Sequence, residues 1–167
     1  MSKYLLLMLL ISALSCPEPK KPPYQIPQNA KFLITGDSLK TWKLARRFNN
    51  QYRMNMGDCF LSHQQTYKSD MTMYDNSGDH KDCGDTMHAQ WEITTDKEGH
   101  SYLKWISDQL PDLMNIKVDY KYFKILHISD EELSIQFKHK QYSNKTTTIT
   151  DFFIPEHISV EDRDFHW

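Results

Sequence analysis

Hydrophobicity that alternates from one residue to the next is the strongest structural signal in this chain of 167 residues. In ELSIQFKHK, residues 132–140, the apolar side chains Leu133, Ile135 and Phe137 share one parity and polar side chains occupy the other. Successive side chains on a strand point to opposite faces, so this pattern predicts a strand with one buried face. Helical spacing of apolar residues is scarce, which indicates a mainly β domain.

Similar patterns predict eight strands joined mostly by short links. In residues 119–129, Tyr120, Tyr122, Leu126 and Ile128 share one parity, and we assign the two tyrosines to the interior. Closing the sheet removes its unpaired edge strands, so we predict an all-β, eight-stranded antiparallel up-and-down barrel with little helix. Residues 49–62 and 109–117 are expected to hold a short helix or a loop over a barrel end. The strands are expected around residues 41–48, 63–67, 71–75, 89–95, 101–107, 119–129, 132–140 and 146–154.

The first 30 residues differ from the rest in composition. Residues 4–14 are almost wholly apolar, but eleven residues at about 1.5 Å each cannot cross the ~30 Å hydrocarbon core of a bilayer. Lys3, this apolar stretch and the small residues before Cys16 predict a signal peptide over residues 1–15. Residues 16–30 hold five of the seven prolines, which predicts a semi-rigid linker before a single domain over residues 31–167.

Cys16 has two interpretations. The run ALSC, residues 13–16, resembles a bacterial lipobox, at which the cysteine becomes the lipid-modified first residue; an ordinary signal-peptidase site is the alternative. If Cys16 is lipidated, the two remaining cysteines, Cys59 and Cys83, can pair with each other in an oxidising compartment. We therefore predict a membrane anchor at Cys16 and a place in the cell envelope, as an outer-membrane lipoprotein facing the periplasm or the surface, with plain secretion as the alternative.

Cys59 and Cys83 are predicted to form a structural disulfide. They are 24 positions apart and flank a predicted hairpin. Closing a loop of that length contributes about 3 kcal/mol in the chain-entropy model. A metal pair is disfavoured, because neither cysteine belongs to a CxxC with a histidine at ligand spacing.

Several classes of site find no support in the sequence. The chain has a net charge of −2 and no GxGxxG or GxxxxGK run, which disfavours nucleic-acid and phosphate-loop binding. Neither GxSxG nor HExxH occurs, so we predict no enzyme, no catalytic residue and no cofactor. Asp75, Asp79, Asp82 and Asp85 lie close together, but they miss the spacing of a Ca²⁺ loop, so an ordinary polar loop is favoured and no metal is assigned.

The order of motifs resembles a known family. Five motifs follow one another in this order: TWKL at residues 41–44, the Asp58-Cys59 pair, the hairpin over residues 65–76, the loop SGDHKDCGD and a strand containing Trp91. This arrangement, over residues 38–154, resembles the lipocalin-like lipoproteins of Bacteroidetes-type bacteria. The resemblance implies an eight-stranded up-and-down barrel that can enclose an apolar cavity.

Aromatic residues make up 13% of the chain and fall largely in the predicted strands. Inward aromatic side chains either fill a small barrel or leave a cup for one small apolar molecule. The resemblance favours a small hydrophobic ligand; the alternative is a filled barrel that serves as a structural or protein-interaction module, with no partner identified. The candidate ligand-binding interior comprises Trp91, Ile93, Leu103, Trp105, Tyr120, Tyr122, Leu133, Ile135 and Phe137.

Overall fold

The computed structural model describes residues 22–140 and 145–166. The predicted signal peptide, Cys16 and the first part of the proline-rich segment lie outside the described residues. Among the residues described, no helix is both long enough and apolar enough to cross a membrane.

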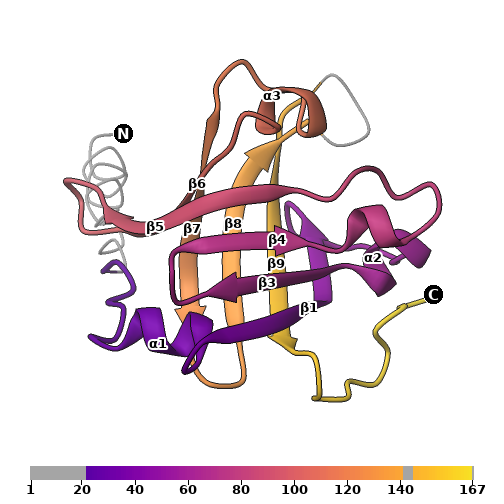
Figure 1. The fold of residues 1–167 in the computed structure, drawn as a ribbon. Helices are drawn as coiled ribbons and strands as arrows, with labels where there is room; N and C mark the ends of the chain where they lie inside the picture. The colour runs from indigo at the N-terminus through magenta and orange to yellow at the C-terminus, as the bar shows by residue number, and fades with distance from the viewer. Residues whose placement is uncertain (1–21, 141–144, 167) are drawn as a thin grey trace, which may run out of the picture.

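Eight antiparallel strands in the described part of the chain close into a barrel, as the alternation predicts (Figure 1). They are β1 (Leu39–Asn49), β3 (Gln64–Lys68), β4 (Thr72–Asp75), β5 (His88–Thr95), β6 (Ser101–Ile106), β7 (Tyr120–Ile128), β8 (Leu133–His139) and β9 (Thr147–Pro155). Each strand pairs with the next, and the pairing of β1 with β9 closes the barrel. The two-residue β2 (Tyr52–Arg53) pairs with the end of β1.

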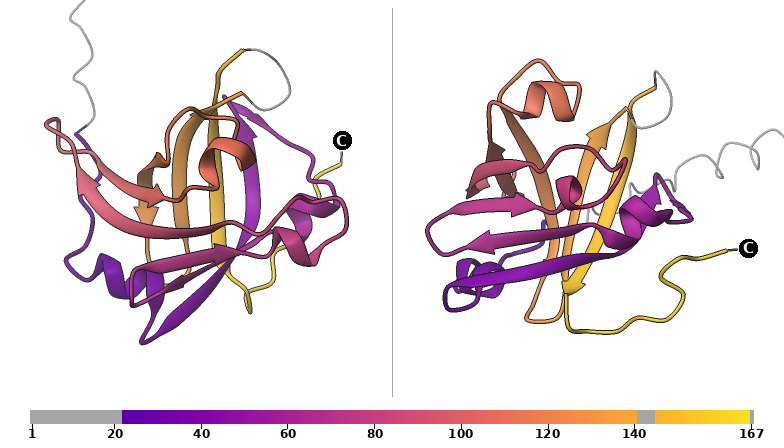
Figure 2. Two further views of the ribbon diagram at one scale, coloured as in Figure 1. Left: turned by 45° about the horizontal axis from the view of Figure 1, so that its top comes forward. Right: turned by 45° about the vertical axis from the view of Figure 1, so that its right-hand side comes forward.

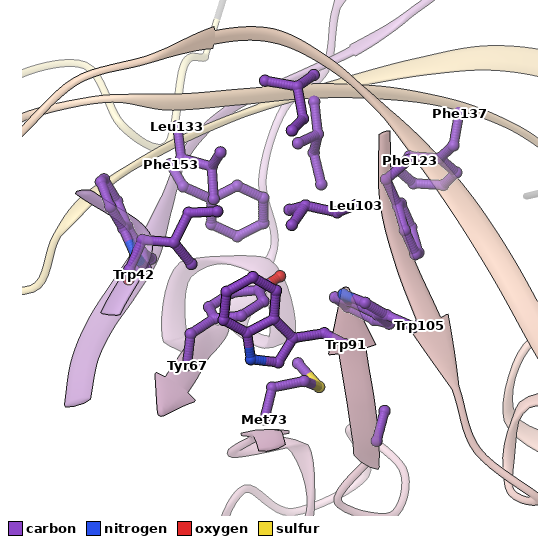
Figure 3. Packing of buried hydrophobic residues seen from close by; sticks show 14 of the residues in the cluster. Trp42, Tyr67, Met73, Trp91, Leu103, Trp105, Phe123, Leu133, Phe137 and Phe153 are labelled. Atoms are coloured by element: carbon purple, nitrogen blue, oxygen red, sulfur yellow. The ribbon is translucent and has the colours of Figure 1, made fainter. Parts of the chain in front are cut away.

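The core lies between two crossing groups of strands. Strands β3, β4 and β5 pass in front of β7, β8 and β9 in Figure 1, and Figure 2 shows the same arrangement from two other sides. Apolar side chains of one parity from each strand meet in the space between them (Figure 3). The largest fully buried ones are Trp42, Tyr67, Trp91, Phe123 and Phe153.

A short helix, α1 (Ala30–Thr35), packs at one end of the barrel. It places Leu33 and Ile34 in the core, and the indole nitrogen of Trp42 donates to the carbonyl of Ile34 at 2.9 Å. The helix ends at Gly36, whose φ of +59° is one that residues with a Cβ rarely adopt. The alternation did not predict α1, which begins at the boundary between the linker and the domain.

Contacts with the barrel begin before α1. The hydroxyl of Tyr24 donates to the carbonyl of Ile128 and accepts from its amide, each at 3.2 Å. Tyr24 and Ile26 also pack against the core cluster. The end of the proline-rich segment that we interpret as a linker is therefore attached to the barrel.

Two further short helices lie in the segments 49–62 and 109–117, which were predicted to hold a helix or a loop. They are α2 (Asp58–Ser62) and α3 (Leu110–Leu113), and α3 lies at the top of Figure 1 while α1 lies at the bottom. A single 3₁₀ turn, η1 (Ser77–Asp79), follows β4.

The interior assignment is wrong for two residues of β7. Tyr120 and Tyr122 are 41% and 46% exposed, whereas Phe123 and Ile125 are buried. The pairing of β7 with β8 shifts register between Ile125 and His127, and this bulge reverses the parity of the strand. Ile128 is consequently buried although it shares sequence parity with the two tyrosines. Counting every second residue as inward treats β7 as one continuous strand, whereas the bulge reverses which side chains point inward.

Candidate ligand-binding cavity

The barrel holds a cavity of about 200 Å³ at the end away from α1. One wall is apolar and is built from strands β6, β7 and β8 by Trp105, Phe123, Ile135 and Phe137. Leu113 and Met114, at the end of α3, and Met87 add to the apolar lining. The rest of the lining is mostly polar and comes from β1, β4, β9, the start of β3 with the preceding His63, and the loop after β4.

An ion pair inside the barrel forms the centre of the polar wall. Arg47 Nε and Nη2 donate to the two carboxylate oxygens of Asp151 at 2.7 and 2.6 Å. The side chain of Asp151 is only 2% exposed, and the ring of Phe60 lies 4.4 Å from the Arg47 guanidinium. Two parallel bonds connect the partners and cancel their charges, so the negative charge of this wall comes from Asp75 and Asp85, which also line the cavity.

A hydrogen-bonded chain runs from the barrel centre to the polar wall. Tyr67 donates its hydroxyl to Gln65 Oε1 at 3.0 Å, and Gln65 Nε2 lies 3.1 Å from His63 Nε2. An amide nitrogen can only donate, so His63 Nε2 accepts and the neutral ring carries its proton on Nδ1. Burial lowers the pKa of His63, an effect that the Asp75 carboxylate opposes and Arg47 reinforces. The imidazole is therefore neutral at pH 7.

The indole N–H of Trp105 makes no hydrogen bond of good geometry within residues 22–140 and 145–166, although a weak bond to the Tyr67 hydroxyl opposes the rise that burial causes in the pKa of Tyr67. The side chain is 4% exposed, and Figure 3 shows its nitrogen turned toward the centre of the barrel. A buried donor with only a weak partner recovers little of its desolvation cost. An acceptor brought into the cavity would reduce that cost.

Lys121 brings a positive charge to the inward face of β7. It shares the buried parity with Phe123, and its Nζ lies 5.3 Å from the ring centroid of Phe137 and donates to the carbonyl of Lys138 at 3.3 Å. Burial lowers the pKa of Lys121. Burial lowers the pKa of His139, and the positive charges of Lys121 and Arg47 lower it further.

The predicted disulfide is confirmed and lies at the cavity rim. Cys59 on α2 is bonded to Cys83, which lines the cavity mouth with Gly84. Asp75 Oδ1 accepts from the backbone amides of Ser77 and Met87, each at 3.0 Å, and so joins the two ends of this loop. Among the described residues, no three His, Cys, Asp or Glu side chains converge on a point where a metal could bind.

The predicted interior residues separate into three groups. Trp105, Ile135 and Phe137 line the cavity. Trp91, Leu103 and Leu133 are buried away from it and fill the barrel, while Ile93 is half-buried against the same core. Tyr120 and Tyr122 lie outside. The barrel is therefore packed in one half and hollow in the other, and binding by the lining residues stays a prediction.

Four residues of the polar wall were not predicted from the sequence, namely Arg47, His63, Gln65 and Asp151, whereas Asp75 and Asp85 were assigned to an ordinary polar loop. One signal was available: in TTTITDFFI, Asp151 shares parity with Ile149 and Phe153, so the strand pattern places a carboxylate on the buried face. A buried carboxylate requires a partner. Nothing local identifies that partner as Arg47, which lies 104 positions away.

These features define a class: a closed, up-and-down antiparallel barrel with a helix at one end and a cavity of mixed polarity at the other. No protein-family model matches the chain, and no curated protein matches its sequence. Among solved structures, the chain is similar to a lipocalin-like protein from Bacteroides uniformis, with a TM-score of 0.48 and 12% sequence identity. That match covers 71% of this chain and 98% of the other.

Proposed function

We propose that the chain binds one small amphipathic molecule in its barrel. The cavity of about 200 Å³, with an aromatic wall facing a polar wall, carries this proposal. A dry cavity of about 150 Å³ can hold benzene, whereas pockets for larger ligands span about 300–1,000 Å³. The size therefore supports a single ring or a short chain rather than a long lipid.

The polar wall supports a head group without negative charge. Arg47 and Asp151 neutralise each other and His63 is neutral, but the carboxylates of Asp75 and Asp85 also line the cavity, so the wall repels an anionic group. The N–H of Trp105, which has only a weak bond to the Tyr67 hydroxyl, favours a ligand that brings an acceptor. A phenol, an alcohol or an amide meets these requirements, which narrows the hydrophobic ligand of the sequence-based prediction to a molecule with one polar group. The hollow half of the barrel also favours this function over a filled structural or interaction module.

Titrating the purified protein with para-substituted phenols tests the proposal by calorimetry and by the shift in melting temperature. Ile135→Phe adds volume to the cavity lining and should abolish binding. Ile93→Phe is the matched control, because Ile93 packs against the core without lining the cavity, and this variant should still bind. Binding that persists in Ile135→Phe, or a panel that gives neither heat nor thermal shift, would contradict the proposal.

We further propose that Cys16 carries a lipid and that the barrel works in the cell envelope. The lipobox-like ALSC, the proline-rich segment that follows it and the confirmed pairing of the other two cysteines support this view. Mass measurement of the intact protein from its native host tests it, with Cys16→Ser as the control. An unmodified Cys16 would favour secretion instead.

A further inference from the structure

Three tyrosines form a patch on the outside of the barrel. Tyr102 of β6 and Tyr122 of β7 have ring centroids 6.1 Å apart, and Tyr120 lies 5.7 Å from Tyr122. Both contacts are edge-to-face, so parts of the ring faces remain available to a partner. We call this surface, with Lys124 and Lys138 beside it, the tyrosine face.

Two hollows flank the ridge made by Tyr102 and Tyr122. The first, of about 440 Å³, is completed by Thr94, Thr95 and Asp96. The second measures about 210 Å³ and lies over β7, β8 and β9. Besides the two tyrosines, its lining comprises Lys124, Gln136, Phe137, Lys138 and Thr148.

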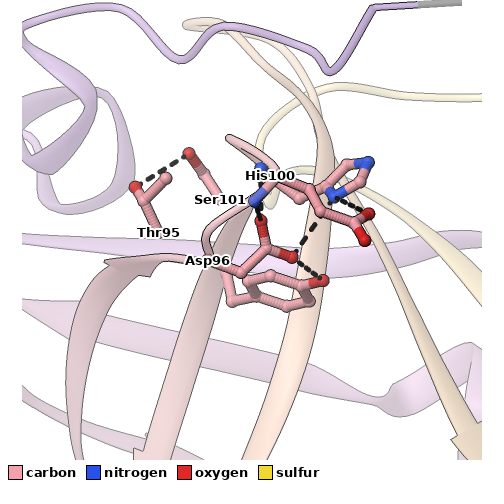
Figure 4. A network of polar contacts seen from close by, with 6 residues as sticks. Thr95, Asp96, His100 and Ser101 are labelled. Atoms are coloured by element: carbon pink, nitrogen blue, oxygen red, sulfur yellow. Dashed lines mark hydrogen bonds and ion pairs between the residues drawn. The ribbon is translucent and has the colours of Figure 1, made fainter.

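The ridge is held in place by the turn between β5 and β6 (Figure 4). Tyr102 donates its hydroxyl to Asp96 Oδ2 at 2.9 Å, while Asp96 Oδ1 accepts from the amides of Glu98 and His100 at 2.9 Å. Desolvation raises the pKa of Asp96, but these bonds, together with one from the His100 ring, outweigh it and lower the pKa to about 2. Asp96 therefore stays ionised at neutral pH, and the Tyr102 ring is positioned before any partner arrives.

The charges on the tyrosine face are unevenly distributed. Lys104 is neutralised by Glu92 at 2.8 Å, but within the described residues neither Lys124 nor Lys138 has an ion-pair partner. The second hollow therefore presents two free ammonium groups, whereas the first presents the carboxylate of Asp96. An anionic group favours the second hollow, and a neutral group favours the first.

The lining excludes one common kind of partner. Neither hollow contains a leucine, isoleucine, valine or methionine, so neither offers an aliphatic pocket for the apolar anchors of a peptide. What they offer is aromatic ring surface surrounded by hydroxyl, amide and charged groups. Sugar rings match this combination, since their C–H faces pack on aromatic rings and their hydroxyls pair with polar side chains.

We propose that the tyrosine face binds an acidic oligosaccharide. Its anionic unit, bearing a carboxylate or a sulfate, lies between Lys124 and Lys138, a neutral unit lies beside Asp96, and the chain crosses Tyr122. This site is on the outside of the barrel and does not depend on a ligand in the cavity.

Affinity electrophoresis of the full-length protein through gels with polygalacturonate, dextran sulfate or neutral dextran tests the proposal. The first two polymers distinguish carboxylate from sulfate, and we expect retardation by at least one of them and none by dextran. Tyr122→Ala should weaken binding up to about tenfold, while Tyr122→Phe keeps the ring and should retain it. The double variant Lys124→Gln/Lys138→Gln should bind more weakly and lose most of the salt dependence.

The matched control is Tyr52→Ala, which removes a tyrosine that is 70% exposed on β2, and it should bind as the unaltered protein does. Melting curves establish that every variant is folded. No retardation by either acidic polymer, equal retardation by dextran, or equal losses in Tyr52→Ala and Tyr122→Ala would overturn the proposal. Equally tight binding of poly-glutamate would overturn it in favour of an acidic peptide. Loss of retardation by the acidic polymer in Ile135→Phe would instead show that the polymer binds in the cavity.

Discussion

At the scale of single residues, the stability of the polar wall depends on Arg47 and Asp151. Placing two charges inside a barrel carries a desolvation cost that only their mutual bonds offset. Both carboxylate oxygens of Asp151 accept from Arg47. Removing the arginine would leave a carboxylate with almost no exposure to water.

We expect Arg47→Met to lower the free energy of unfolding by about 3 kcal/mol, because it leaves an uncompensated buried charge. Arg46→Met is the matched control; it removes an exposed arginine next in sequence and should change stability by less than about 0.5 kcal/mol. The double variant Arg47→Met/Asp151→Leu should recover most of the loss. Urea denaturation measures all three, and a double variant no more stable than Arg47→Met would contradict this account.

At the scale of secondary-structure elements, β7 shows how one bulge changes which side chains reach the core. Before the shift, Lys121, Phe123 and Ile125 point inward; after it, Ile128 does. The bulge thereby keeps both ends of the strand in contact with the interior. It also leaves Tyr120 and Tyr122 on the outer surface, where they form the tyrosine face.

The two neighbouring aromatics of β7 should therefore respond oppositely to truncation. Phe123→Ala removes a ring that is 2% exposed and contacts Trp105 and Phe137, so it should cost about 3–5 kcal/mol. Tyr122→Ala should change the free energy of unfolding by no more than about 0.5 kcal/mol. Denaturant titration of each variant provides the measurement. A larger loss in Tyr122→Ala than in Phe123→Ala would support the inward assignment made from the sequence.

At the scale of the whole molecule, buried bases make stability depend on pH. Burial lowers the pKa of both His63 and His139 in the folded protein. The unfolded chain therefore binds more protons once the pH falls below the ordinary histidine pKa of 6.5, and protonation favours unfolding. Their contribution is fully present above that pH and falls as the pH drops toward their folded pKa.

We expect the free energy of unfolding to be lower at pH 5 than at pH 7.5. His63→Gln should reduce the difference, since it removes a titrating group while keeping an acceptor for Gln65. His157→Gln, at an exposed position outside the cavity, is the control and should leave the difference unchanged. Denaturation at both pH values decides the matter, and a His63→Gln variant with the full pH dependence would show that His63 is not responsible.

Much of the architecture was predictable because strand patterning is local. Alternation located the eight strands, and short polar links indicated that neighbours in sequence pair in space. The two cysteines indicated the disulfide. The side chains that face the interior were harder to predict, because period-two counting carries no information about a bulge such as the one after Ile125, and α1 has too few residues to show a helical period.

The sequence by itself determined the strand count, the up-and-down order and the pairing of Cys59 with Cys83, since each rests on local pattern or on composition. Only the tertiary structure decided which half of the barrel is packed and which is hollow. It also decided that Arg47 meets Asp151 and that three tyrosines gather outside. Those outcomes depend on side chains from distant strands meeting in three dimensions, and the volume left between them is a property of the closed barrel rather than of any segment.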